Sequence, residues 1–181
     1  MTTKKLTQIA LMTAIISVLS PLSIPLAGEV PVSLATFAVM LAGVLLGPKD
    51  GTICAALYLL LGAIGIPVFA GYASGVSVLF GVRGGFLFGY VILAFFSGLF
   101  VRKEEKNVKK KVVQMIVGMI IGNAVLYALG IIWFMFVTKM GIMASLAACV
   151  IPFLPGDTLK IVAVFLLSPR LSKVIDKSFA K

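Results

Sequence analysis

Five long stretches of this chain contain no Asp, Glu, Lys or Arg, and they limit its possible folds more than any other feature. The uncharged runs cover residues 6–28, 30–48, 51–82, 84–101 and 112–138. A helix that crosses a membrane needs about 17–25 mostly apolar residues, so each run is long enough to span. The composition agrees, since the chain is only 12% charged whereas soluble domains carry about 25%. The sequence predicts an all-α, multi-pass integral membrane protein that forms one transmembrane domain over residues 1–181.

The apolar pattern divides into six expected transmembrane helices. They cover residues 6–27, 33–47, 51–66, 84–102, 110–137 and 155–176. The run 51–82 exceeds one span and is broken in its second half by glycines and Pro67, so we interpret it as a helix followed by an ordered apolar loop. Segment 140–154 is uncharged but contains Pro152, and proline breaks or kinks a helix interior. This segment is either a re-entrant stub or the first half of a kinked helix.

Basic residues collect on one side of these spans. With the N-terminus inside, most of the 16 Lys and Arg residues fall in cytoplasmic segments, namely Lys4, Lys5, Lys49, Arg102, Lys103, Lys106, Lys109, Lys110, Lys111, Arg170, Lys173, Lys177 and Lys181. Lys and Arg near the ends of spans stay in the cytoplasm. We therefore expect an N-in, C-in protein of the cell membrane. The charge run 102–111 is interpreted as a solvated connector that can touch anionic lipid, and the net charge of +10 does not indicate nucleic acid.

The side chains that hold metals or nucleotides are missing from the sequence. There is no His, and Cys54 and Cys149 each lie in an apolar segment, where a single Cys behaves as a small hydrophobe. A zinc site would have no ligands to use. The Gly-x-x-x-x-Gly-Lys-[Ser/Thr] motif that cradles ATP phosphates is also absent from the chain. We expect no metal, no cofactor and no ATP hydrolysis by this chain.

The segment 151–160, which reads Ile-Pro-Phe-Leu-Pro-Gly-Asp-Thr-Leu-Lys, carries the main candidate site. Pro155 suits the first turn of a helix, so we expect Asp157 in that turn and Lys160 on the same face. In the N-in, C-in topology this pair lies in the outer part of the membrane. Ionisable groups at such depth are costly and usually face the protein interior or a wet cavity. The pair either binds a ligand with N–H groups and a carboxylate or only neutralises itself near the headgroups.

Three further features are candidates for ligand contact. Asn123, in the middle of a predicted span, either contacts ligand or joins two helices by hydrogen bonds. Tyr127, one turn later, and Trp133 either line a cavity or pack in the core. The apolar loop 67–83 is too long for a plain connector, and ordered loops of this kind are often lids. Arg83, at its end, either anchors to headgroups or faces a ligand carboxylate.

Small residues also recur four positions apart, which lets helices approach closely. The pairs are Ala10 and Ala14, Gly43 and Gly47, Gly85 and Gly89, and Gly118 and Gly122. We expect most of them to be internal packing contacts. For Ala10 and Ala14, near the cytoplasmic end of the first helix, the alternative is a docking stripe for another protein.

Four blocks of this sequence carry a resemblance to a known family. They are Val-Pro-Val-Ser-Leu-Ala-Thr-Phe-Ala-Val-Met-Leu-Ala-Gly at 30–43, Gly-Pro-Lys-Asp-Gly at 47–51, Gly-Ile-Pro-Val-Phe-Ala-Gly at 65–71 and Pro-Phe-Leu-Pro-Gly-Asp-Thr-Leu-Lys at 152–160. These blocks resemble the BioY family, the biotin-specific substrate-binding (S) components of energy-coupling factor (ECF) transporters. They occur in the family's order and spacing and cover nearly the whole chain. One departure is Ala35, where many relatives carry Gln, so a ligand contact by that amide is absent here.

The resemblance implies a six-helix S component that binds biotin near the outer surface, beneath the first and third interhelical loops. It maps the family's Asp-x-x-Lys pair onto Asp157 and Lys160, and its helix 1 alanine motif onto Ala10 and Ala14. It also implies a partner ECF module of one transmembrane coupling protein and two cytoplasmic ATPases. Because this chain lacks the ATP-binding motif, uphill import would take its energy from that module.

The resulting hypothesis is a high-affinity biotin-binding subunit of an ATP-driven vitamin importer. Asp157 would accept from the ureido N–H groups with Asn123 assisting, and Lys160 and Arg83 are candidates for the carboxylate or the ureido carbonyl. The apolar ring and chain would rest against Leu34, Phe69 and Tyr72, with Tyr127 nearby.

Two other classes of function compete with this hypothesis. A membrane enzyme is disfavoured because Asp157 has no second carboxylate, His or nucleophile near it in the motif. A self-sufficient oligomeric channel or facilitator for a small carboxylate-bearing solute remains the alternative.

Overall fold

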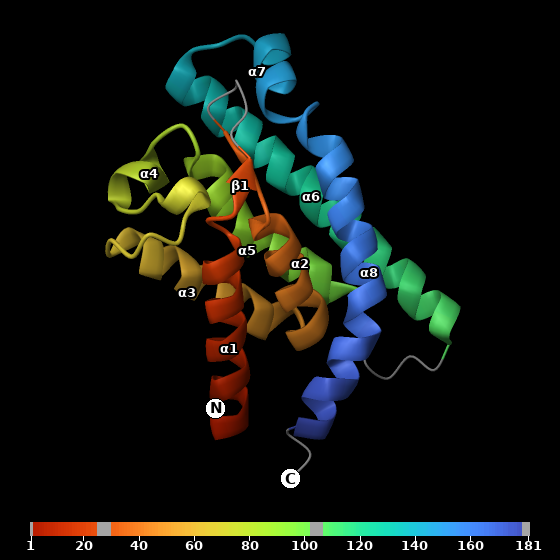
Figure 1. Ribbon diagram of the computed structural model, residues 1–181. Coiled ribbons are helices and arrows are strands. Elements are labelled where there is room, and N and C mark those ends of the chain that lie inside the picture. Colours follow the sequence, from red (N-terminus) through yellow and green to blue (C-terminus); the bar gives the residue numbers. More distant parts are fainter. Residues whose placement is uncertain (1, 25–29, 102–106, 179–181) are drawn as a thin grey trace.

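The computed structural model describes residues 2–24, 30–101 and 107–178, and most of these residues are helical (Figure 1). The helices are α1 (Thr3–Leu19), α2 (Ala35–Leu46), α3 (Pro48–Ala63), α4 (Val76–Phe80), α5 (Gly84–Leu99), α6 (Val108–Thr138), α7 (Ile142–Cys149) and α8 (Phe153–Ser178), with one 3₁₀ turn, η1 (Ala70–Tyr72). A two-residue antiparallel hairpin pairs β1 (Ser23–Ile24) with β2 (Val32–Ser33).

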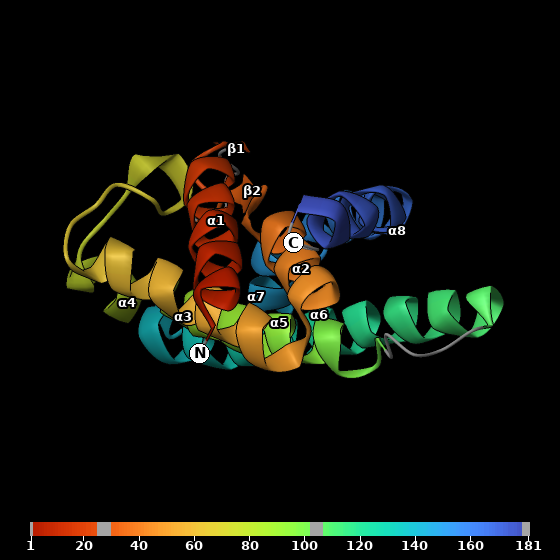
Figure 2. The same cartoon turned by 90° about the horizontal axis from the view of Figure 1, so that it is seen from below.

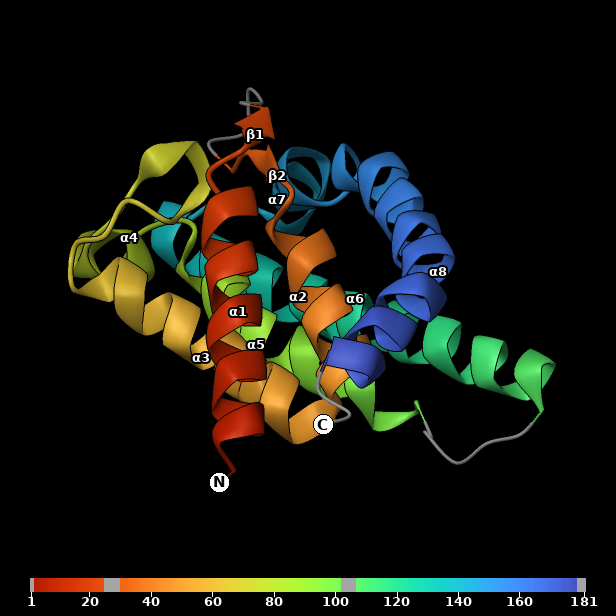
Figure 3. The same cartoon turned by 60° about the horizontal axis from the view of Figure 1, so that its bottom comes forward.

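The long helices give the molecule two opposite ends. The start of α1 and the end of α8 lie at the same end, and the β1–β2 hairpin, α7 and the start of α8 lie at the opposite end (Figures 1 and 3). Helix α6 runs obliquely across the molecule between these ends. The hairpin end is where the structure brings together loops and helix termini from distant parts of the sequence.

Helix α5 occupies the centre of the packing. It contacts α2, α3 and α6, while α1 packs on α2 and α3, and α8 packs mainly on α2 with a smaller contact to α6. Seen from below, α8 stands apart from the start of α6 (Figure 2). The core is made of aliphatic, Met and aromatic side chains, among which Leu93, Met40 and Tyr58 are fully buried.

Glycines let these helices approach closely, as their spacing predicts. A Cβ added to Gly43 would stand 2.3 Å from the carbonyl oxygen of Ala94, and one added to Gly98 would stand 2.5 Å from that of Gly43. Between α5 and α6, a Cβ added to Gly85 would stand 2.4 Å from the Trp133 side chain, and one added to Gly89 would stand 2.5 Å from the Leu126 side chain. These glycines are therefore internal packing contacts, in line with the expectation for the Gly-xxx-Gly spacings.

The six helices expected from sequence all appear, with shifted boundaries. The first ends at Leu19 instead of residue 27, because the chain turns at Ser20 and forms β1. The chain is mostly helical as predicted, and the short β1–β2 hairpin is an addition that the sequence did not predict. Residues 25–27 of that expected helix and residues 102–106 of the charge run lie outside the described residues.

Two segments left open by the sequence have helical structure of their own. The apolar loop 67–83 is ordered and contains η1 and α4. Segment 140–154 forms α7, which meets the following helix at a 45° bend across a short break. This geometry fits either a re-entrant stub or a broken span, so both interpretations of that segment stand.

Judged by length and apolar composition, fewer than six of the described helices qualify as membrane spans. Within the described residues, one helix, Lys109–Thr138, is long and apolar enough to cross a membrane, and the bent pair at α7 and α8 would be a second. Helices Ala35–Leu46 and Gly84–Leu99 are apolar but shorter. Large apolar side chains on the outer surface are nevertheless common, among them Val18, Phe136, Leu159 and Met143. Soluble monomers rarely expose so many.

Substituting Gly43 with Ala tests the close packing of α2 on α5. The added methyl would clash with the backbone of Ala94, so we expect the free energy of unfolding to fall by about 1–3 kcal/mol. Thermal unfolding of the detergent-purified protein measures the change. Gly141→Ala is the control, because an added Cβ there meets no atom within 4 Å. Equal stability of the two variants would contradict the packing described here.

Candidate functional site

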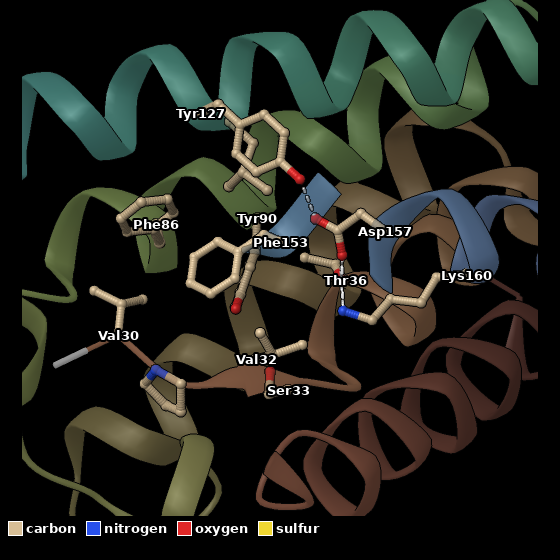
Figure 4. Close-up of a pocket in the computed structure, with 12 residues that line it drawn as sticks. Val30, Val32, Ser33, Thr36, Phe86, Tyr90, Tyr127, Phe153, Asp157 and Lys160 are labelled. Atoms are coloured by element: carbon tan, nitrogen blue, oxygen red, sulfur yellow. Dashed lines mark hydrogen bonds and ion pairs between the residues drawn. The ribbon is translucent and has the colours of Figure 1, made fainter. Parts of the chain in front are cut away.

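A small pocket opens among α2, α5, α6, α8 and the β2 strand, at the hairpin end of the molecule (Figure 4). Its lining residues combine apolar walls with a polar corner and are Val30, Pro31, Val32, Ser33, Thr36, Phe86, Tyr90, Leu126, Tyr127, Phe153, Asp157 and Lys160. The cavity measures about 30 Å³, which has room for about two water molecules. A drug-sized ligand usually needs about 300 Å³ or more, so the walls have to move apart to admit one.

Helix α8 supplies both charged groups of the polar corner. It begins at Phe153, two residues before the expected start, so Pro155 lies in the first turn as predicted. Asp157 is the fifth residue of α8 and lies just beyond the first turn. The prediction that Asp157 lies in the first turn is therefore wrong. The i, i+3 spacing places Asp157 and Lys160 on one face of α8, and that face is buried against α2.

Asp157 and Lys160 form a buried ion pair. The Lys160 Nζ lies 2.7 Å from Asp157 Oδ1, and the two side chains are 10% and 7% exposed. Burying two charges costs several kcal/mol per ion unless the pair is well aligned and its remaining hydrogen-bonding atoms are satisfied. The surrounding side chains provide that satisfaction.

Two hydroxyl groups from other helices complete the network. Thr36 of α2 donates to Asp157 Oδ1 at 3.0 Å and accepts from Lys160 Nζ at 2.9 Å. Tyr127 of α6 donates to the other carboxylate oxygen, Asp157 Oδ2. Figure 4 shows Tyr127 pointing from α6 toward the carboxylate, with Thr36 beside both charged groups. The polar corner thus joins three helices that are far apart in the sequence.

The opposite walls of the pocket are mostly aromatic and aliphatic. Phe86 of α5 and Phe153 of α8 meet edge to face, with ring centroids 6.3 Å apart. Tyr90 and Ser33 add hydroxyl groups to this otherwise apolar side, and both are largely buried. Such a pocket suits a ligand with an apolar ring system and one compact polar group.

Of the residues predicted to bind ligand, the structure brings Asp157, Lys160 and Tyr127 together in this pocket. Asn123 is buried one turn below Tyr127 and is not among the lining residues. Its Nδ2 donates to the Met119 carbonyl at 3.1 Å and to Met40 Sδ at 3.3 Å, and its Oδ1 has no hydrogen-bond partner in the described part of the chain. In this state Asn123 joins α6 to α2.

The predicted residues of the loop 67–83 stand outside the lining. Phe69 is almost fully buried, with its ring against Gly62 and edge-on to Tyr58 at 5.6 Å. Tyr72 is 66% exposed, and the Arg83 Nη1 donates to the Ala70 carbonyl at 3.1 Å. Phe69 and Arg83 therefore hold the loop in place in this state, and their contact with ligand stays a prediction.

Four remaining predicted residues lie elsewhere on the molecule. Leu34 is the residue before α2 and is 38% exposed, without being part of the pocket lining. Ala10 and Ala14 lie on an exposed face of α1, as a docking stripe requires. Trp133 donates from Nε1 to the Gly81 carbonyl at 2.9 Å, which fixes the end of the loop to α6.

Sequence reasoning missed several lining residues, of which Thr36 is the most important. It lies inside the block at 30–43, where its neighbours are apolar and nothing in the local pattern distinguishes it from a core threonine. Its role depends on a contact with α8, 121 positions away in the sequence. Phe86, Tyr90 and Phe153 were missed for the same reason, since a buried aromatic residue in a span is usually packing.

Comparisons with known proteins agree on one family. The model of the BioY family matches residues 1–177. The "Biotin transporter BioY" of Thermotoga maritima is 37% identical over 171 residues, which cover 94% of this chain and 97% of that protein. The "Probable biotin transporter BioY" of Pyrococcus horikoshii is 32% identical over 171 residues, covering 94% and 98%.

A solved structure shares the fold. It is the crystal structure of the S-component for biotin from an ECF-type ABC transporter, which superposes with a TM-score of 0.83 at 32% sequence identity. The match covers 96% of this chain and 95% of that one. The helical arrangement described above is therefore that of an S component.

Substituting Lys160 with Met tests the energetics of the buried pair. This change leaves the Asp157 carboxylate buried without its cation, so we expect the free energy of unfolding to fall by about 3–5 kcal/mol. The double variant Asp157→Asn with Lys160→Met removes both charges and should recover most of that loss. Thermal unfolding without ligand measures both, and a Lys160→Met protein as stable as the wild type would contradict the description of the pair.

Proposed function

This chain belongs to the BioY family, and on that premise we propose that it is the biotin-binding S component of an ECF-type vitamin importer. It is a membrane transport subunit, not an enzyme, as its relatives and its structural neighbour are. We place the biotin site in the pocket beside Asp157 and Lys160. The observation that carries this assignment is the set of hydrogen-bonding positions left open in the polar corner.

The polar corner has one donor and one acceptor position to spare. An ammonium group has three N–H donors, and within the described residues Lys160 uses two, toward Thr36 and Asp157. A carboxylate has about four acceptor positions, and Asp157 uses three, toward Tyr127, Thr36 and Lys160. One open donor and one open acceptor on an ion-paired couple match, in kind and in number, one edge of a cyclic urea, where a carbonyl oxygen is next to an N–H group.

The charge balance of the pocket favours the ureido ring over the carboxylate at this corner. Asp157 and Lys160 cancel each other's formal charge, so a neutral carbonyl adds no net charge to the buried site. A carboxylate in the same position would leave an excess negative charge in a poorly solvated place. We therefore place the ureido group at Lys160 and Asp157, and the apolar ring of biotin between Phe86, Phe153 and the other apolar walls.

The loop 67–83 and its neighbours would provide the outer part of the site. We propose that the pocket widens as the ligand enters and that Arg83 approaches the biotin carboxylate, with Tyr72, Phe69 and Leu34 covering the apolar chain. Arg83 and the loop already touch through the Ala70 carbonyl, so a movement of one would move the other. Asn123, whose buried Oδ1 has no hydrogen-bond partner among the described residues, would assist from the α6 side.

Six spans with both termini in the cytoplasm remain our proposal for the membrane topology of the whole chain, taken as one domain. Two observations support it. Basic residues collect at the two termini and in every second connection between the expected spans. The start of α1 and the end of α8 lie at the same end of the molecule (Figure 1). In this orientation the pocket opens to the outside of the cell membrane. Anionic lipid headgroups would contact the basic cytoplasmic ends of the helices.

Energy for import would come from a partner module of one coupling protein and two ATPases. We propose that Ala10 and Ala14, on the exposed face of α1, are where the coupling protein docks. Small side chains on an exposed helix face permit close approach of a partner helix in the membrane.

Isothermal titration of biotin into the detergent-purified protein tests the site. We expect the wild type to bind tightly and both Asp157→Asn and Lys160→Ala to weaken binding by at least about 2 kcal/mol, because each change leaves a buried polar partner unpaired. Leu159→Ala is a matched control, since Leu159 lies between the two and is 71% exposed. Wild-type affinity in both site variants would remove the pocket from the proposal, and a wild type that ignores biotin would refute the function.

Docking on α1 is tested by co-purification with a tagged coupling protein. We expect Ala10→Trp to reduce strongly the amount of this chain recovered with the coupling protein and ATPases while biotin binding is unchanged, because the bulky ring prevents close helix approach. Val18→Trp is the control, being exposed further along α1 toward the hairpin end. Full recovery with Trp at position 10 would show that the partner docks elsewhere.

A further inference from the structure

The hydroxyl of Thr36 has an arrangement that differs from that of several other helical hydroxyls in the described chain. Several of those donate to the backbone carbonyl four residues earlier, namely Thr7, Ser17, Thr52, Thr138, Ser145 and Thr158. That local bond uses the hydroxyl proton and keeps the side chain on its own helix. Thr36 makes no such bond and donates across to α8 instead.

The position of Thr36 in α2 explains the difference. Helix α2 begins at Ala35, so the residue four positions before Thr36 is Val32, which belongs to β2 and not to the helix. The first turn of a helix has no preceding turn whose carbonyls can receive its side chains. The Thr36 proton is therefore available for Asp157, and the β2–α2 junction determines that availability.

Thr36 contacts both members of the ion pair at once. Its oxygen accepts from Lys160 Nζ at 2.9 Å while its proton goes to Asp157 Oδ1 at 3.0 Å, and Lys160 Nζ to Asp157 Oδ1 measures 2.7 Å. The three groups close a triangle in which two of the three Lys160 N–H bonds have fixed directions. Because the ammonium is tetrahedral, the direction of the third N–H bond is then fixed as well.

We infer that Thr36 is a positioning residue, which aims the free N–H of Lys160 into the pocket and thereby sets how well the site receives a carbonyl oxygen. The inference rests on the proposed function, since it concerns the same ligand site. Without the Thr36 hydroxyl, Lys160 would be held by Asp157 alone and its ammonium would rotate about that single contact. Groups already fixed in the bound geometry bind more tightly than groups that must be ordered by the ligand.

The test is titration of biotin into three variants and the wild type. Thr36→Val keeps the shape of the side chain but removes the hydroxyl, so we expect biotin binding to weaken by about 10-fold or more. Thr36→Ser keeps the hydroxyl and should bind close to the wild-type value. Thr158→Val is the matched control, because Thr158 lies on α8, is exposed, and bonds only to its own helix at the Leu154 carbonyl. It should bind as the wild type does.

A double-mutant cycle separates positioning from packing. If Thr36 acts through Lys160, the Thr36→Val change should weaken biotin binding much less in a Lys160→Met background than in the wild type. Competition titration measures the affinities that are too low for direct titration. An equal loss in both backgrounds, or wild-type affinity in Thr36→Val, overturns the inference while leaving biotin binding intact. Should Thr36→Val fail to give a folded monomer, Thr36→Ala decides by the same comparison. A wild type that does not bind biotin instead overturns the proposed function, and this inference with it.

Discussion

The buried pair of Asp157 and Lys160 is the interaction on which the rest of the site depends. Two charges are stable at this depth only if their remaining donors and acceptors find partners. Thr36 and Tyr127 supply those partners from α2 and α6, so the pair also fixes how three helices meet. By count of the bonds among the described residues, the same network leaves one N–H of Lys160 and one acceptor position of Asp157 without a partner. In the proposed site, one set of atoms would serve both as a stabilising contact between helices and as the contact for a cyclic urea.

The position of that pair depends on close packing elsewhere in the fold. Helix α2 brings Thr36 to α8, and α2 itself rests on α5 through contacts at Gly43 and Gly98 that leave no room for a side chain. Helix α6 brings Tyr127 to the carboxylate, and the glycines of α5 let α6 lie close along that helix. The loop 67–83 is fastened to this assembly through Phe69, Arg83 and the bond from Trp133 to Gly81. The small residues therefore determine where the polar groups meet.

Much of this could be predicted from the sequence, and the rest could not for identifiable reasons. Uncharged runs located five of the six expected helices, and the depth of Asp157 and Lys160 in an apolar segment marked them as a candidate site, because both signals are local. The turn at Ser20 and the strand β1 were missed, since the uncharged run 6–28 continues through them. Thr36 was missed because its partner is 121 positions away. Asn123 and Phe69 were easy to notice but lie outside the pocket lining, since residue type alone does not say which face of a helix or loop a side chain takes.

The most direct test of this account is a crystal structure of the protein with biotin bound. The account predicts the ureido carbonyl oxygen within hydrogen-bonding distance of Lys160 Nζ, an adjacent ureido N–H directed at Asp157, and Phe86 and Phe153 moved apart around the apolar ring. Biotin bound elsewhere, with the contacts among Thr36, Asp157 and Lys160 unchanged and the pocket still closed, would contradict it.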